Sequence, residues 1–235
     1  MILWPQPDGS VLATPQPAHA VVAGQVMRHL SSEPFMANAA TQHDCAWHPW
    51  EAAPEFDAAT GLPRAFNAVP AERHVPMWER GVATALASWG LWEALLILRH
   101  GTYIYGLANR TGASPESLAA LDGYEARAKV QGAALMARLG VTEAEVAPRT
   151  LDLARVDGIG LALCWGKARF DCAGIQLART GPFAATLDPW PLDVPDLVVE
   201  TTALRLPARF ADEAAMRLAL PEAPREPLRF TLSPR

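Results

Sequence analysis

The distribution of the prolines constrains the fold of this 235-residue chain more than any other feature. Ten prolines lie within residues 5–76 and nine within residues 182–234, whereas the 105 residues between these groups contain only Pro115 and Pro148. Proline is tolerated in the first turn of a helix but disrupts its interior. The prolines therefore predict a helical middle, in which Pro115 and Pro148 mark helix starts, between two more irregular ends.

Hydrophobic periodicity locates the individual helices. Apolar residues that recur every three to four positions, behind a proline or a serine cap, indicate amphipathic helices. The predicted helices span residues 18–30, 35–47, 75–88, 91–100, 114–139 and 149–166. Residues 91–100 are apolar on nearly all sides, which predicts that this helix is central and buried.

The two ends of the chain indicate β-strands. Residues 2–4 and 11–13 flank a Pro-Asp-Gly-Ser turn, and residues 197–206 and 228–232 alternate in polarity or favour β-branched side chains, with a short helix at 212–220 between them. We therefore predict a mainly α fold of the α+β class, with residues 1–235 in a single domain. Its helical core spans about residues 15–170, and residues 1–14 together with 174–235 form a small β-rich appendage.

Charge and cysteine content narrow the partners and the compartment. The chain has 20 Lys and Arg against 25 Asp and Glu, a net charge of −5, which does not favour nucleic acid or an anionic membrane as a partner. Residues 1–10 lack the basic start of a signal peptide, and the longest apolar run, residues 91–98, is too short to cross a membrane. The three cysteines include no CxxC pair, as is typical of reduced thiols. We expect a cytoplasmic protein that binds a small-molecule substrate, and a homo-oligomer is compatible with the sequence.

Three polar residues lie on helical faces that are otherwise apolar: His19, His43 and Asp157. Each of them alone is most simply explained as a core residue with a local partner. A buried carboxylate is costly, however, unless a cation or a metal ion neutralises it. Taken together, the three residues indicate a metal site. Imidazole and carboxylate ligands suit Fe, Mn, Zn or Ni, whereas a calcium site would use oxygen ligands only.

The candidate ligands follow one another in the pattern H…HD…H…H…D, formed by His19, His43, Asp44, His74, His100 and Asp157. We expect His74 in a loop between Pro70 and Pro76. We expect His43 and Asp44 within a helix, where adjacent side chains point about 100° apart. One of the two can then face each of two ions, or Asp44 can bridge them.

This pattern resembles the HD-domain superfamily of metal enzymes, and the chain is more similar still to a bacterial HD-related family known only as a domain of unknown function. The features that carry this likeness over essentially the whole chain are HDxxW at residues 43–47, Trp50, Gly61-Leu62-Pro63, Trp78 with Gly81, His100-Gly101 and Arg229-Phe230-Thr231-Leu232. The resemblance implies an HD-like helical core that binds one or two divalent ions, Fe or Mn first and Zn or Ni as alternatives. It also implies ligand roles: one ion is held by His19, His43 and Asp157, a second by His74 and His100, and both are bridged by Asp44.

The resemblance further implies an HD-type binuclear hydrolase that acts on a small molecule such as a phosphoester, with Asp44 as a catalytic residue in proton transfer. Many such enzymes carry a lysine three residues after the His-Asp pair, where this chain has Trp47. The missing lysine argues against phosphate chemistry. We expect Trp47 to form a wall of the substrate pocket and Arg99 to contact an anionic group of the substrate.

Two alternatives to hydrolysis remain. A mixed-valent diiron oxygenase of the HD type would use the same ligands, and it is favoured by the missing lysine and the aromatic surroundings. The intervals of 24 residues from His19 to His43 and of 57 residues from His100 to Asp157 are also similar to those of oxygenase members. The other alternative is a non-catalytic metal- or ligand-binding protein that retains the fold. The prevalence of hydrolases in the superfamily favours hydrolysis by a small margin.

Overall fold

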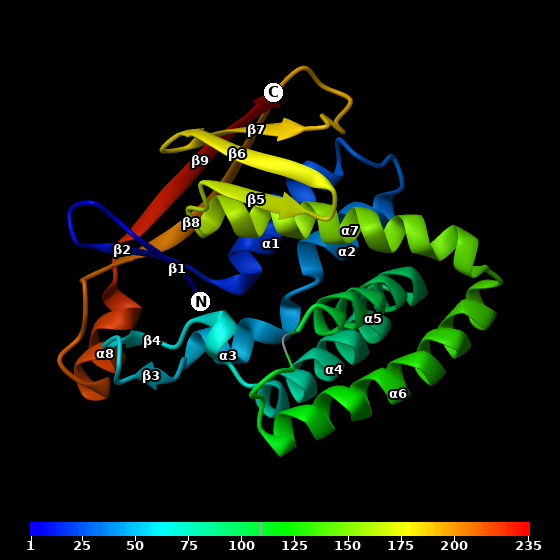
Figure 1. The fold of residues 1–235 in the computed structure, drawn as a ribbon, viewed down its shortest axis with the longest axis horizontal. Coiled ribbons are helices and arrows are strands. Elements are labelled where there is room, and N and C mark those ends of the chain that lie inside the picture. The colour runs from blue at the N-terminus through cyan, green and yellow to red at the C-terminus, as the bar shows by residue number, and fades with distance from the viewer. Residues whose placement is uncertain (109) are drawn as a thin grey trace.

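The computed structural model describes residues 1–108 and 110–235, and it combines a group of helices with a large curled sheet (Figure 1). The longer helices are α1 (Gln16–Met27), α2 (Pro34–Gln42), α4 (Ala71–Ser88), α5 (Leu91–Gly106), α6 (Pro115–Leu139) and α7 (Glu143–Cys164). Helices α4, α5 and α6 pack on one another, whereas α1 and α7 lie between this group and the sheet. The short helices are α3 (His48–Ala52) and α8 (Glu213–Ala219). Within the described residues, none of the helices combines the length and apolar character that crossing a membrane requires.

The main sheet has seven strands in the order β1-β2-β8-β9-β7-β6-β5, and it curls into a half-barrel. Its strands are β1 (Ile2–Pro5), β2 (Val11–Thr14), β5 (Arg169–Cys172), β6 (Ile175–Gly181), β7 (Ala184–Asp188), β8 (Leu197–Leu206) and β9 (Arg225–Pro234). All neighbouring strands are antiparallel except β7 and β9, which are parallel. A separate two-stranded ribbon consists of β3 (Phe56–Asp57) and β4 (Leu62–Pro63).

The expected small β appendage is wrong in size, because the sheet is a substantial part of the fold. Both termini contribute strands to it, as predicted. Strands β6 and β7 also lie within the predicted β-rich residues 174–235, although their bounds were not predicted, whereas β5 lies before these residues. These strands are only four to seven residues long, and several of their residues are exposed. Strands this short contain only a few alternating positions, so their bounds are difficult to predict from the pattern.

The largest hydrophobic core joins the sheet to the helices. It contains Ile2 and Phe230 from the sheet, Val26 from α1 and Leu163 from α7, all of them buried. A second core lies among α4, α5 and α6. The sheet therefore supports α1 and α7, the two helices that carry the first and the last residue of the HD-like pattern.

Helices α4 and α7 begin earlier than predicted, because the predicted starts were residues 75 and 149. Helix α7 begins at Glu143 instead of residue 149, because Thr142 and Glu145 form a reciprocal capping box, so that Pro148 lies inside the helix. Helix α4 begins at Ala71 and contains Pro76. Both prolines therefore lie beyond the first residues of their helices, which begin one to two turns earlier than the prolines indicated.

Candidate metal centre

Four separate elements bring five of the six predicted ligands together. His19 comes from α1, His100 from α5 and Asp157 from α7, whereas His43 and Asp44 follow directly after α2. Figure 1 shows these elements converging near the middle of the molecule, between the sheet and the α4–α6 group. The sequence order of the pattern thus becomes one spatial cluster.

Asp157 lies at the centre of this cluster. Its Oδ1 is 2.9 Å from His19 Nε2 and 3.1 Å from His43 Nε2, and its Oδ2 is 3.3 Å from His100 Nε2. The ring centroids of His19 and His43 are 5.2 Å apart, as are those of His43 and His100. One carboxylate therefore faces three imidazoles.

Asp44 is the second buried carboxylate, and its side chain is only 5% exposed. Its Oδ2 lies 3.4 Å from His19 Nδ1 and 3.7 Å from His43 Nε2, distances longer than those of typical hydrogen bonds. The donor atoms fall into two groups whose members lie within 4.8 Å of one another: His19, His43 and Asp44, and His43, His100 and Asp157. These groups could hold metal ions.

The tautomers of two histidines fit metal binding. His19 Nδ1 lies 2.6 Å from the carbonyl oxygen of Gln16, and His43 Nδ1 lies 2.7 Å from that of Ala40. A carbonyl oxygen only accepts, so both Nδ1 atoms donate, and a neutral ring then carries its lone pair on Nε2. Metal-binding histidines are commonly fixed by such a bond from the other ring nitrogen.

The pKa values of His43 and Asp157 show that this cluster favours a positive charge. Burial alone would lower the pKa of His43, but the carboxylates of Asp44 and Asp157 outweigh it and raise the pKa to about 9. Burial alone would raise the pKa of Asp157, but hydrogen bonds from His100, His19 and His43 hold it well below its usual range. The two buried carboxylates thus need a cation beside them, which is either a protonated imidazole or a metal ion.

His74 lies beside the cluster, and in a helix instead of the expected loop. It is in the first turn of α4, where the Tyr105 hydroxyl is 2.7 Å from its Nδ1. Its Nε2 is buried and has no hydrogen-bond partner among the described residues, as is also true of His100 Nδ1. Burial lowers the pKa of His74 to about 4, so the ring is neutral. His74 is outside the two donor groups but lines the same cavity.

The His-Asp doublet is not helical, contrary to the prediction for residues 35–47. Helix α2 ends at Gln42, and Asp44 adopts φ −101° and ψ 19° before a short 3-10 turn over Cys45–Trp47. The backbone therefore leaves the helix at these two residues, where His43 Nε2 and Asp44 Oδ2 lie 3.7 Å apart. This change of direction still leaves His43 and Asp44 facing the same cluster.

Two glycines near Asp157, Gly158 and Gly160, allow α7 to come close to its neighbours. A Cβ on Gly160 would lie 3.1 Å from the carbonyl oxygen of His19, and a Cβ on Gly158 would lie 3.0 Å from the Cα of Cys172. Both approaches are tighter than ordinary side-chain contacts. Gly160 thus allows α7, which carries Asp157, to lie close to α1, which carries His19, and Gly158 allows α7 to lie close to β5.

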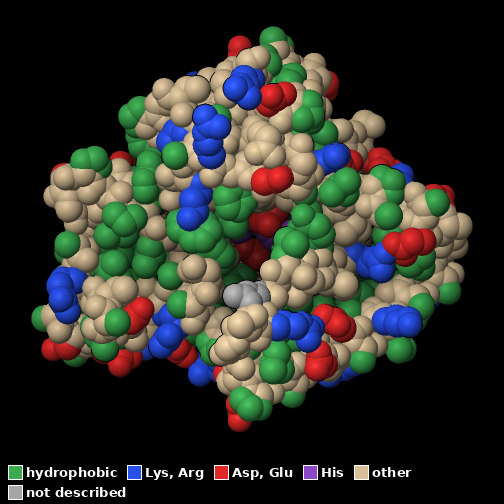
Figure 2. All heavy atoms as spheres, in the orientation of Figure 1, with side chains coloured by type: hydrophobic (Ala, Val, Ile, Leu, Met, Phe, Trp, Pro, Cys, Tyr) green, Lys and Arg blue, Asp and Glu red, His purple; other side chains and the backbone are tan. Residues whose placement is uncertain are grey.

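A cavity of about 370 Å³ opens onto the cluster. Figure 2 shows its mouth near the middle of the displayed face, with acidic and histidine side chains at its floor and hydrophobic ones around it. The described residues that line it are Gln16, His19, His43, Asp44, Trp47, Phe66, Asn67, Val69, His74, Trp78, His100, Ile104, Tyr105, Ala108, Asp157 and Leu161. Trp47 is thus in the wall, with its ring centroid 4.9 Å from that of His74.

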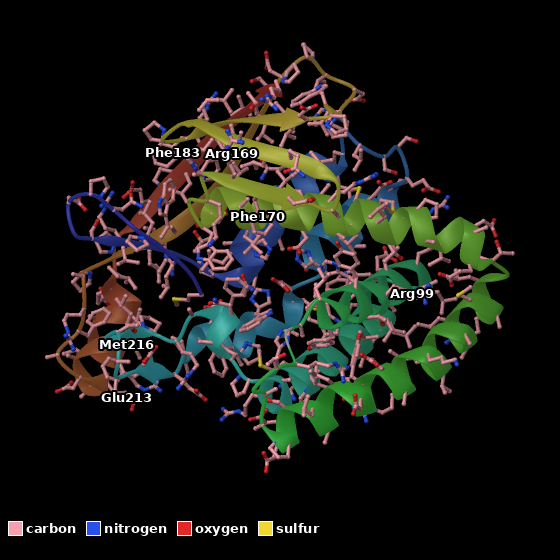
Figure 3. The ribbon with its side chains drawn as sticks, viewed as in Figure 1. Arg99, Arg169, Phe170, Phe183, Glu213 and Met216 are labelled. Atoms are coloured by element: carbon pink, nitrogen blue, oxygen red, sulfur yellow. The ribbon has the colours of Figure 1, made fainter. Side chains whose placement is uncertain are left out.

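Arg99 is not brought to this cavity. Its guanidinium forms an ion pair with Glu143 at the start of α7, and Figure 3 shows it on the side of α5 that faces this end of α7. The sequence analysis did not predict that Gln16, Tyr105 and Leu161 line the cavity. Gln16 and Leu161 could have been found from helical spacing, because each lies one turn from a predicted ligand.

A comparison with known families covers most of the chain. A family model described as "Protein of unknown function (DUF3891)" matches residues 1–208. The chain belongs to the DUF3891 family. Membership confirms the predicted likeness to a family of unknown function, whereas the link to the HD superfamily stays a prediction. No curated protein and no solved structure matches this DUF3891 chain.

Proposed function

We propose that this DUF3891 protein is a binuclear metal-dependent hydrolase of small molecules. The observation that carries the proposal is the burial of two carboxylates and three imidazoles in one cluster at the floor of a cavity. A cluster of this kind is costly to bury without a cation to neutralise it, and a cavity above it gives a substrate access to that cation. The HD-like order of the same residues supports the proposal independently.

The ligand assignment follows the HD-like pattern. His19, His43 and Asp157 would hold one ion, His100 and His74 would contribute to the second, and Asp44 would be a ligand of both. The unpartnered, buried Nε2 of His74 supports its inclusion, because a buried nitrogen without a partner is unfavourable unless a ligand satisfies it. Nitrogen and oxygen donors of this kind suit Fe, Mn, Zn or Ni.

Side chains of the protein transfer the proton and form the cavity wall. When bound, the ions supply Lewis acidity toward the scissile bond and toward water. Asp44 accepts a proton from water and passes it to the leaving group, so that the water's hydroxyl stays with the other product. Trp47 and Tyr105 form the wall of the cavity, and Tyr105 also holds the His74 ring through Nδ1. Arg99 has no part in this proposal, because it pairs with Glu143 outside the cavity.

A mixed-valent diiron oxygenase is the second candidate, and one observation favours it. The described residues of the cavity wall are largely aromatic or aliphatic and include no lysine or arginine. Such a wall suits an apolar substrate better than a phosphoester, and the oxygenase does not require a phosphoester.

Metal content and reactivity together test the proposal. Protein purified with and without air would be assayed for metals, for a mixed-valent iron signal by electron paramagnetic resonance, and for hydrolysis of ester and phosphoester panels. Two Mn, Zn or Ni ions per chain with hydrolytic activity are expected. Two irons with a mixed-valent signal would select the oxygenase instead. A metal-loaded protein without either activity would indicate a non-catalytic metal-binding protein, and a chain that binds no metal would refute both the hydrolase and the oxygenase.

A further inference from the structure

The floor of the cavity can attract an anionic group only through the ions of the proposed centre. The described lining residues include the carboxylates of Asp44 and Asp157 but no lysine or arginine. Two divalent ions would bring four positive charges beside these two carboxylates, and bound cations are often the largest local charges in a site. A carboxylate of a ligand can then coordinate the ions, whereas without them it meets two groups of its own charge.

The rim of the cavity is apolar, and Figure 2 shows hydrophobic side chains around its mouth. Five partly exposed side chains of this kind, here called the apolar collar, line the cavity: Phe66, Val69, Ile104, Ala108 and Leu161. Ile104 lies one turn after His100 on α5, and Leu161 lies one turn after Asp157 on α7. A ligand with one end at the ions can therefore lay its other end on the collar, where the burial of hydrocarbon is favourable.

The cavity wall has few polar groups that could bind the hydroxyls of a sugar or another polyol. The Tyr105 hydroxyl already shares a hydrogen bond with His74, and the Trp78 indole N–H donates to a backbone carbonyl. Of the two amide side chains in the described lining, Gln16 is buried and Asn67 is exposed. Hydroxyls that leave water for this wall would lose hydrogen bonds without replacing most of them, which costs free energy.

We propose that the cavity binds a small amphiphile, with a carboxylate head at the metal ions and a hydrocarbon body against the apolar collar. The volume of about 370 Å³ lies at the lower end of the usual range for ligand pockets, so the body is small. This inference rests on the proposed function and narrows its substrates to esters or amides with an apolar acyl group. Hydrolysis adds water across the acyl bond, which leaves the carboxylate on the apolar body and releases an alcohol or an amine.

Three carboxylates that resemble such products test the inference: cyclohexenecarboxylate, shikimate and acetate. Shikimate has the ring and the carboxylate of cyclohexenecarboxylate with three added hydroxyls, whereas acetate has the carboxylate without the ring. The full chain would be loaded with Zn²⁺, which is diamagnetic, and its metal content would be measured before and after each titration. Saturation-transfer NMR titrations would give the Kd of each probe for the loaded parent and for the parent treated with chelator.

Two variants of the collar and one matched control would be titrated in the same way. Leu161→Asn replaces an apolar side chain of the collar by a polar one of similar size. Val69→Thr keeps the shape of its side chain, so it tests the collar even if Leu161→Asn fails to fold. The control is Leu151→Asn, because Leu151 lies on the same helix but is 38% exposed and outside the cavity lining.

We expect the loaded parent to bind cyclohexenecarboxylate at least about tenfold more tightly than acetate, because each buried methylene contributes about fourfold in affinity. Shikimate should bind at least about tenfold more weakly than cyclohexenecarboxylate, because its hydroxyls lose their water partners. Leu161→Asn should reduce the preference for cyclohexenecarboxylate over acetate about three- to tenfold, and Val69→Thr about two- to fourfold. Both variants should leave the Kd of acetate unchanged, the control should match the parent, and chelator should weaken all three probes.

Several results would overturn the inference and leave the hydrolase standing. These are equal affinities of the three carboxylates for the zinc-loaded parent, tighter binding of shikimate, no binding of any probe, or a preference that both collar variants retain in full. Undiminished binding after chelation would show that the head is not at the ions, and would overturn the inference as well. A chain that takes up no zinc would refute the proposed function, and the inference would fall with it.

Discussion

The replacement of Asp157 by asparagine probes the proposed centre most directly. The two oxygens of Asp157 lie within 3.3 Å of three imidazole Nε2 atoms, so the residue joins more of the cluster than any other ligand described above. Asparagine keeps the size of the side chain and one acceptor oxygen but removes the negative charge. We expect Asp157→Asn to fold and to lose most of its affinity for metal.

The size of the effect follows from mass action. A metal present at 100 times its Kd stabilises the folded state by about 2.7 kcal/mol. In a chain of this length, 1 kcal/mol shifts the melting temperature by about 2–4 °C. Metal should therefore raise the Tm of the parent by about 5–11 °C per ion, and that of Asp157→Asn by a small fraction of this.

Thermal melts with metal and with chelator measure this difference. Asp152→Asn is a matched control, because Asp152 lies on the same helix but pairs with Arg155 instead of a histidine. The control should respond to metal as the parent does. If the parent and Asp157→Asn show equal shifts, or if neither metal nor chelator changes the parent, Asp157 is a structural residue and the metal reading of the cluster is wrong.

Three further predictions follow from the same structure. Metal analysis should find that Asp44→Ala loses both ions and that His74→Ala keeps one, and full occupancy in folded Asp44→Ala would exclude a bridging role. Gly160→Leu should push α7 away from α1 and lower the Tm of the metal-free protein as well as its metal affinity, so a parent-like value of both would contradict the close packing. Burial raises the pKa of the Cys164 and Cys172 thiols to about 12, so iodoacetamide at pH 8 should leave both unmodified in the folded chain, as peptide mass spectrometry can show. Because the unfolded chain ionises these thiols near pH 9, they should also make the fold less stable as the pH rises from about 9 to 12.

The helices could largely be predicted from the sequence, because their apolar stripes and caps are local. The Ser114 cap and the αL Gly140 bound α6 as predicted, and Asp212 caps the short helix α8. The starts of α4 and α7 could not be predicted from proline alone. At α7 the capping box of Thr142 and Glu145 begins the helix upstream of Pro148.

The polar residues on apolar faces were the useful indication of the site. His19 and Asp157 could be selected because each interrupts an apolar stripe, and the structure places them 2.9 Å apart. The position of Arg99 could not be predicted, because its partner Glu143 is 44 residues away in the chain. The same limit applies to His74, whose contact with Tyr105 depends on how α4 packs on α5.

Strand β9 joins the two halves of the sheet, so the continuity of the sheet depends on residues 225–234. Although β9 comes last in the described sequence, it lies between β8 and β7 and pairs with both. Without β9, the strand order leaves β1, β2 and β8 as one partial sheet and β5, β6 and β7 as another, with β8 and β7 as newly unpaired edges. Unpaired edges are templates for association with other chains. A chain cut before residue 225 would therefore keep every residue of the candidate metal centre and yet expose the edges of β7 and β8 to association with other chains.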